Sequence, residues 1–150
     1  MKFEINRETW IRGNPNQGTL LREEDGHQCC LGFFLEACGV SRDNLASLGE
    51  PHEPFQWQGS PDTKEIPIPP AASFLIHVEQ YEEDEDGDPC DDRDLSCTDA
   101  GSRLMGWNDD GDLAEAAREK AIADEFWKHG HEAVFVGSSQ ATCEGQDTKP

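Results

Sequence analysis

The chain has 150 residues, which is enough for one domain. Its 32 Asp and Glu residues outnumber 12 Lys and Arg residues, and the formal net charge is −20. Such a charge repels nucleic acid and anionic membranes and attracts cations or basic protein surfaces. No apolar run approaches the ~18 residues of a membrane span, and the first residues lack the apolar core of a signal peptide. We therefore expect a cytoplasmic protein that contacts neither nucleic acid nor membrane directly.

The first elements expected along the chain are short. Residues 5–12 are interpreted as a helical turn around a tryptophan, and residues 19–22 have the composition of a strand. Residues 25–26 are Asp-Gly, a strong signal for a tight turn. This part of the chain is therefore expected to be loop-rich.

The strongest apolar segment, residues 29–38, predicts a helix that ends at Gly39. On a helical projection most of its large residues share one broad arc, which places Cys30 and Cys38 in the core. Cys29 falls on the other side, in the first helical turn, where the helix dipole favours a thiolate. Cys29 is therefore expected to be the more accessible thiol.

The middle of the chain is rich in proline, and only two short elements are expected there. Residues 43–48 are interpreted as a short helix and residues 73–78 as a strand. A second main helix follows: Asp112 is the expected N-cap, and Glu115 completes a capping box. We expect this helix to run to about Lys128.

The apolar residues 133–136 predict a final strand. Together these elements predict an α+β fold with two main helices and a few-stranded antiparallel sheet. We expect one domain over residues 1–137, with a long acidic loop inserted at residues 81–99. Residues 138–150 are interpreted as a polar C-terminal tail.

The acid is concentrated in residues 82–94, which hold nine carboxylates against one arginine. The acidic residues are Glu82, Glu83, Asp84, Glu85, Asp86, Asp88, Asp91, Asp92 and Asp94. Adaptation to high salt would coat every face evenly, whereas this concentration favours a dedicated surface or a flexible acidic loop. A solvated loop without a partner is the simpler alternative.

Residue types that bind metal ions occur in the acidic segment and in two His-containing segments. The acidic segment follows part of the EF-hand register, but Arg93 stands where the bidentate Glu is required. His27, Cys29 and Cys30 bring zinc-type ligands close together, as do His129 and His131, yet no Cys-x-x-Cys pair exists. We therefore expect no resident metal or cofactor, and a small metal-stabilised domain remains an alternative.

Several segments follow one another in a distinctive order. They are Trp10-Ile11-Arg12-Gly13, Leu20-Leu21-Arg22, Asp25-Gly26, Cys29-Cys30-Leu31-Gly32-Phe33, Ala37-Cys38-Gly39-Val40, Leu104-Met105, Asn108-Asp109, Ile122-Ala123, Phe126 and Val134-Phe135-Val136. This order resembles a family of small uncharacterised bacteriophage-encoded proteins, and the Cys-Cys-Leu-Gly-Phe stretch is its most specific part. The resemblance carries over no catalytic residues. It implies a context, because phages devote many small acidic proteins to blocking host nucleases and defence complexes.

The function expected from charge and context is inhibition of a host protein in the host cytoplasm. A surface with carboxylates at phosphate-like spacing can occupy the basic groove of a DNA-binding protein, as a DNA mimic does. The expected partner is a nucleic-acid-handling or defence protein with a basic surface, inhibited as an anti-CRISPR or anti-restriction protein would do. The acids of residues 82–94 are the expected binding residues, and Trp57 is a further anchor.

An enzyme is the main alternative. Cys29 at a helix start, followed some 48 residues later by His77 in a strand, is the outline of a small papain-like hydrolase. Cys29 would be the nucleophile and His77 the general base. Such enzymes usually carry Asp-Cys-Ser-Gly at the helix start, whereas this chain has Gln-Cys-Cys-Leu.

Overall fold

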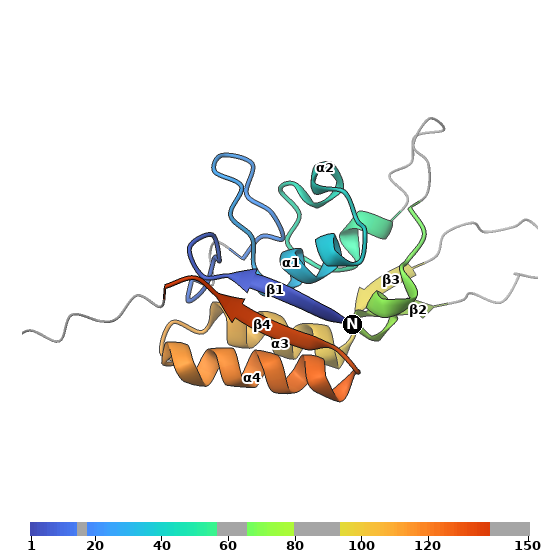
Figure 1. The fold of residues 1–150 in the computed structure, drawn as a ribbon. Helices are drawn as coiled ribbons and strands as arrows, with labels where there is room; N and C mark the ends of the chain where they lie inside the picture. Colours follow the sequence, from blue (N-terminus) through green and yellow to red (C-terminus); the bar gives the residue numbers. More distant parts are fainter. Residues whose placement is uncertain (15–17, 57–65, 80–93, 139–150) are drawn as a thin grey trace, which may run out of the picture.

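The computed structural model describes residues 1–14, 18–56, 66–79 and 94–138 (Figure 1). In chain order its elements are β1 (Lys2–Asn6), α1 (Cys30–Ala37), α2 (Arg42–Leu45), the 3-10 helices η1 (Glu53–Phe55) and η2 (Pro70–Leu75), β2 (Ile76–Glu79), β3 (Asp94–Cys97), α3 (Asp99–Asp109), α4 (Glu115–Lys128) and β4 (Glu132–Val136). The fold is α+β, as the sequence predicts. Within the described ranges, no helix is both long and apolar enough to cross a membrane.

The first and last strands pair with each other. β1 and β4 run parallel, with Phe3 opposite Ala133 and Ile5 opposite Phe135. The antiparallel pairing expected for the sheet is present in β2 and β3, whereas this parallel pair was not expected. The helical turn expected at residues 5–12 is wrong, because Ile5 and Asn6 belong to β1. The strand forms because Phe3 and Ile5 alternate with polar residues, so that both bury against the helices.

Helices α1 and α4 cover this pair of strands, α1 against β1 and α4 against β4 (Figure 1). The contact is aromatic: Phe3 lies 5.2 Å from Phe34 of α1 and 4.9 Å from Phe126 of α4, measured between ring centroids. The Phe34 and Phe126 rings are themselves 4.9 Å apart. One aromatic cluster therefore joins three elements that are far apart in the sequence.

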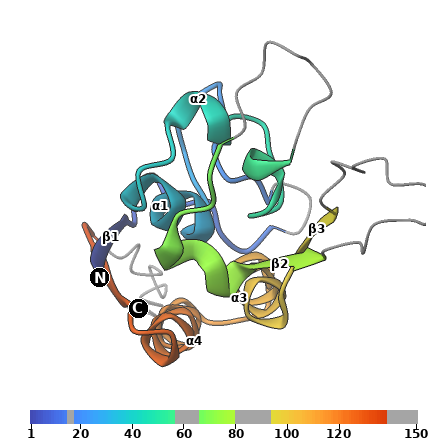
Figure 2. The same ribbon diagram turned by 90° about the vertical axis from the view of Figure 1, so that its right-hand side faces the viewer.

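A second pair of strands lies at another side of the molecule (Figure 2). β2 and β3 are antiparallel, with Ile76 opposite Cys97 and Glu79 opposite Asp94. The strand expected at residues 73–78 is therefore only partly present, because the chain remains a 3-10 helix up to Leu75. Residues 80–93 connect β2 to β3 and lie outside the described residues.

Helix α3 was not expected from the sequence. Two glycines, Gly101 and Gly106, weaken the helical pattern. Packing explains Gly101, because a Cβ there would lie 2.5 Å from the Sγ of Cys97. The helix begins where the Thr98 hydroxyl accepts a hydrogen bond from the backbone N–H of Gly101, at 3.2 Å.

Helix α4 begins two residues later than expected, at Glu115. The capping box is wrong: the N-cap is Ala114, which makes no side-chain cap, and the backbone N–H of Asp112 donates to Asp110 instead. The buried Arg118 guanidinium holds this connection by donating to the carbonyls of Trp107, Asp110 and Leu113. Arg118 thus fixes the segment between α3 and α4, but as a donor it does not cap the N–H groups of the first turn of α4.

The remaining expectations have mixed outcomes. Residues 19–22 form no strand; Leu21 makes only an isolated bridge to Ala46. The Asp-Gly turn is confirmed, with Gly26 at a φ of +72°. The short helix expected at residues 43–48 is α2, and β4 confirms the final strand.

Candidate partner-binding site

The β2–β3 hairpin carries the acidic segment. Of the nine acids expected to bind a partner, those from Glu82 to Asp92 lie outside the described residues, and Asp94 is the first residue of β3. Asp94 is exposed and lies directly opposite Glu79, whose side chain is also exposed. Two carboxylates opposite each other on neighbouring strands repel, so the acidic segment begins and ends between like charges.

The last described residue before Trp57 lies beside the same hairpin. Trp57 itself is outside the described residues, but the preceding Gln56 donates a hydrogen bond from its Nε2 to the backbone carbonyl of Leu95, at 3.3 Å. Phe55, in η1, is buried and fixes this end of the chain. The two segments expected to contact a partner are therefore anchored at neighbouring points.

Basic side chains in the described part of the chain are all engaged within the fold. The ion pairs are Lys2–Glu132, Arg7–Glu119, Arg12–Glu115, Arg22–Asp25, Arg42–Glu36, Arg103–Glu125, Lys120–Asp124 and Lys128–Glu125. Arg118 donates to backbone carbonyls instead. The surplus of acid over base therefore sets the sign of the surface potential.

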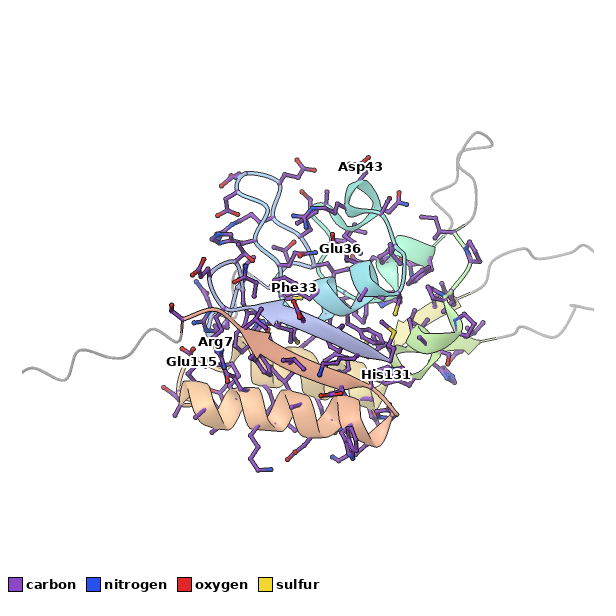
Figure 3. The ribbon with its side chains drawn as sticks, in the orientation of Figure 1. Arg7, Phe33, Glu36, Asp43, Glu115 and His131 are labelled. Carbon is purple, nitrogen blue, oxygen red and sulfur yellow. The ribbon has the colours of Figure 1, made fainter. Side chains whose placement is uncertain are left out.

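Arg7 illustrates how these bases are held. Its guanidinium makes two hydrogen bonds to Glu119, of 2.6 and 2.9 Å, and donates to the carbonyls of Phe135 and Gly137. Glu115 lies nearby at the same end of the molecule (Figure 3). The hydrogen bond to Glu119 raises the pKa of Arg7, although burial opposes it. Arg7 thus joins β1, α4 and β4.

A buried carboxylate that sequence reasoning missed lies between α3 and α4. Glu125 has a fully buried side chain and accepts hydrogen bonds from Arg103, at 2.5 Å, and Lys128, at 2.8 Å. His129 lies 3.6 Å from it. Burial alone raises the pKa of this carboxyl, but the hydrogen bonds from Arg103 and Lys128 outweigh burial and lower the pKa to about 2. In the sequence Glu125 is one acid among many in a helix.

The expected nucleophile is not exposed. Cys29 is the buried N-cap of α1, and burial raises its pKa to about 11 although the backbone N–H groups of Gly32 and Leu31 oppose the rise. The expectation that Cys29 is the accessible thiol is therefore wrong. His77 lies on β2 with an exposed ring 3.9 Å from Glu79, and no described contact joins it to Cys29.

The other expected thiols and ligands pack differently. Cys30 is fully buried, as expected, whereas Cys38 is only half-buried. His129 stacks on Phe74 with 4.3 Å between ring centroids, and His131 lies 5.4 Å from the same ring. Within the described ranges, no group of three or more His, Cys, Asp or Glu residues is arranged to hold a metal.

Asn108 connects the segments that carry the phage-family resemblance. Its buried amide oxygen accepts hydrogen bonds from the Trp10 indole at 2.7 Å and from the backbone N–H of Cys30 at 3.1 Å. Its Nδ2 donates to the carbonyl of Ile11 at 3.0 Å, and its own carbonyl accepts from the N–H of Gly13. Three sequence-distant segments are thus held by one side chain, which is a structural role.

Comparisons with family models, curated proteins and solved structures find no match for this chain. The resemblance to phage-encoded proteins therefore stays a prediction made from residues in this sequence. Function has to be argued from the charge and geometry of the described residues and from the composition of the segments they anchor.

Proposed function

We propose that this protein binds and inhibits a host nucleic-acid-handling or defence protein through its acidic surface. The partner has a basic surface that ordinarily receives nucleic acid. The phage-type context of the proposal rests on the resemblance described above. No catalytic step is part of it, and the buried, protonated state of Cys29 gives the hydrolase alternative no support.

The observation that carries the proposal is the position of the acidic segment. It is inserted between two paired strands, so its ends at Glu79 and Asp94 are held next to each other. The Trp57 segment is anchored beside it through the hydrogen bond from Gln56 to Leu95. Anchoring of the two segments at neighbouring points supports a site that combines the electrostatic steering of acidic residues with a tryptophan, a residue type enriched in interface hot spots.

The basic residues that are held in internal contacts support the same proposal. Because the Lys and Arg side chains of the described part are held in internal contacts, they do not compensate the acids of residues 82–94. Long-range attraction to a basic partner is therefore strong at low salt and is screened within ~8 Å at physiological ionic strength. Binding should accordingly weaken steeply as salt rises.

The first experiment identifies the partner and tests its type. The protein is immobilised, host lysate is applied at low salt, and bound proteins are eluted with rising salt and identified by mass spectrometry. We expect a nuclease or defence complex whose activity falls when the purified protein is added. A protein that retains no partner at low salt, or that leaves the activity of the retained partner unchanged, contradicts the proposal.

A matched pair of variants tests which acids matter. The first variant neutralises Asp84, Asp86, Asp88, Asp91 and Asp92 as Asn; the second neutralises the exposed Glu4, Glu8, Glu23, Glu24 and Asp43 as Gln or Asn. Both change the net charge equally. We expect the association rate to fall at least about tenfold in the first variant and far less in the second, since steering depends on charges near the contact. Equal losses of association rate in the two variants would mean that the acidic segment acts only through the total charge of the protein.

A further inference from the structure

Three side chains that bind soft metal ions meet where β1 begins. They are Met1, Cys38 at the C-cap of α1, and His131 immediately before β4. The parallel pairing of β1 with β4 and the packing of α1 on β1 bring them together from distant parts of the sequence. Figure 3 shows His131 at the end of the sheet where Figure 1 marks the N-terminus.

The distance between the two sulfur atoms suits a shared ion. The Sγ of Cys38 lies 4.0 Å from the Sδ of Met1. Two sulfur ligands at about 2.3 Å from one metal, with an angle between them near the tetrahedral or trigonal value, are about 3.8–4.0 Å apart. The amino group of Met1 lies 3.3 Å from the Nδ1 of His131, so Met1 contacts both other residues.

His131 is held in place by packing. The residue is 9% exposed, and its ring lies 5.0 Å from the Phe34 ring, measured between ring centroids. The Nδ1 of His131 faces the amino group of Met1 at 3.3 Å. A ring packed in this way keeps its orientation, so the Nδ1 stays directed toward Met1.

Cys38 supplies a thiol that is free and partly open to solvent. It is half-buried and forms no disulfide among the described cysteines. Burial raises its pKa to about 11, although the charge of the Met1 amino group opposes this rise. Without a metal the thiol is protonated, and binding of a metal ion releases that proton.

We propose that Met1, Cys38 and His131 form a binding site for one Cu(I) ion. The ion replaces the proton of the Cys38 thiol and the hydrogen bond between Met1 and His131. Thioether and thiolate ligands select Cu(I), which accepts two or three soft ligands. This inference is independent of the partner proposed above.

The test is a Cu(I) titration without oxygen, in competition with a coloured Cu(I) chelator. It uses the full chain with Cys90 and Cys143 replaced by Ser, because both thiols lie outside the described residues. We expect one equivalent of Cu(I) to be retained, and Cys38→Ser to lower the affinity at least about 100-fold. The matched control is Cys97→Ser, which removes the other half-buried thiol and should leave the affinity unchanged.

Two further readouts do not depend on how well the Cys38→Ser variant folds. Cu(I) should protect Cys38 of the otherwise unchanged protein from alkylation, as mass spectrometry of the labelled peptides would report. X-ray absorption should show sulfur at about 2.3 Å and nitrogen at about 2.0 Å from the metal. Loss of all Cu(I) to the chelator, equal affinity in Cys38→Ser, or no protection of Cys38 would each overturn the proposal.

Discussion

Carboxylates differ in burial and pairing between two regions, the α3–α4 junction and the end of the β2–β3 hairpin. At the junction Glu125 is fully buried and is neutralised by Arg103 and Lys128. At the hairpin end Glu79 and Asp94 are exposed and lie opposite each other, with more acid following in the chain. The buried polar groups hold elements together, while the exposed carboxylates face solvent. Net charge alone does not make this distinction.

The largest expected effect tests the interior side of this comparison. Replacing Asn108 with Ala removes hydrogen bonds to Trp10, Ile11 and Cys30 and leaves those buried groups unsatisfied. We expect the free energy of unfolding to fall by about 3 kcal/mol, as measured by urea denaturation. The control is Asn44→Ala on the exposed surface of α2, which should cost less than about 0.5 kcal/mol. If Asn108→Ala lost as little stability as Asn44→Ala, the hydrogen bonds of Asn108 would not be needed to hold the fold together.

The next effect concerns Glu125. Glu125→Gln leaves Arg103 and Lys128 without their counter-charge, and we expect about 2 kcal/mol of destabilisation in the same assay. Asp124→Asn is the matched control on the same helix, because Asp124 forms only an exposed pair with Lys120. That variant should change stability by less than about 0.5 kcal/mol. Similar losses in both variants would break the distinction between buried and exposed acids.

The pH dependence of stability tests the same difference between buried and exposed acids. The pKa of Glu125 is about 2 in the folded protein, below its ordinary value of 4.5. Its stabilising contribution is therefore complete above about pH 4.5 and is lost as the pH falls toward 2, since the unfolded chain takes up the proton first. Urea midpoints between pH 6 and 3, measured in an Asp25→Asn background, should fall less steeply in Glu125→Gln. Asp25 is replaced in both proteins because its own pKa is also about 2.

The smallest expected effect is at the hairpin end. The double variant Glu79→Gln with Asp94→Asn removes a facing pair of like charges from exposed positions. We expect stability to change by no more than about 0.5 kcal/mol, in the stabilising direction. Thermal unfolding at low salt is the most sensitive measurement, because exposed charges are least screened there. A clear loss of stability would show that these two acids stabilise the folded structure.

Local patterns in the sequence predict part of this fold well. α1 was recognisable because its apolar residues are dense and a glycine follows its end, and β4 because its residues are apolar and β-branched. α3 was missed because Gly101 and Gly106 weaken the helical pattern, and only the structure shows that Gly101 is required by the Cys97 side chain packed against it. The parallel pairing of β1 with β4 was missed because it joins residues about 130 positions apart.

The candidate site divides in the same way. The acids of residues 82–94 are evident from composition, but their place between two paired strands was not expected, because residues 81–99 were expected to be loop and β3 was not predicted. The contact between Gln56 and Leu95, which brings the Trp57 segment to the same hairpin, depends on tertiary structure. Burial also decided against Cys29, because a helical projection shows which side of a helix is apolar but not what covers the other side.

The pairing of β1 with β4 has a consequence for how the protein is made. β1 is synthesised long before its partner, which begins at Glu132. Until then Phe3 and Ile5 lack the strand beside them and the Phe126 ring against which Phe3 packs. Contacts this distant in sequence form slowly, so the nascent chain carries an incomplete apolar strand until β4 has been made. β1 is therefore a segment at which molecular chaperones that recognise short apolar stretches would bind the nascent chain.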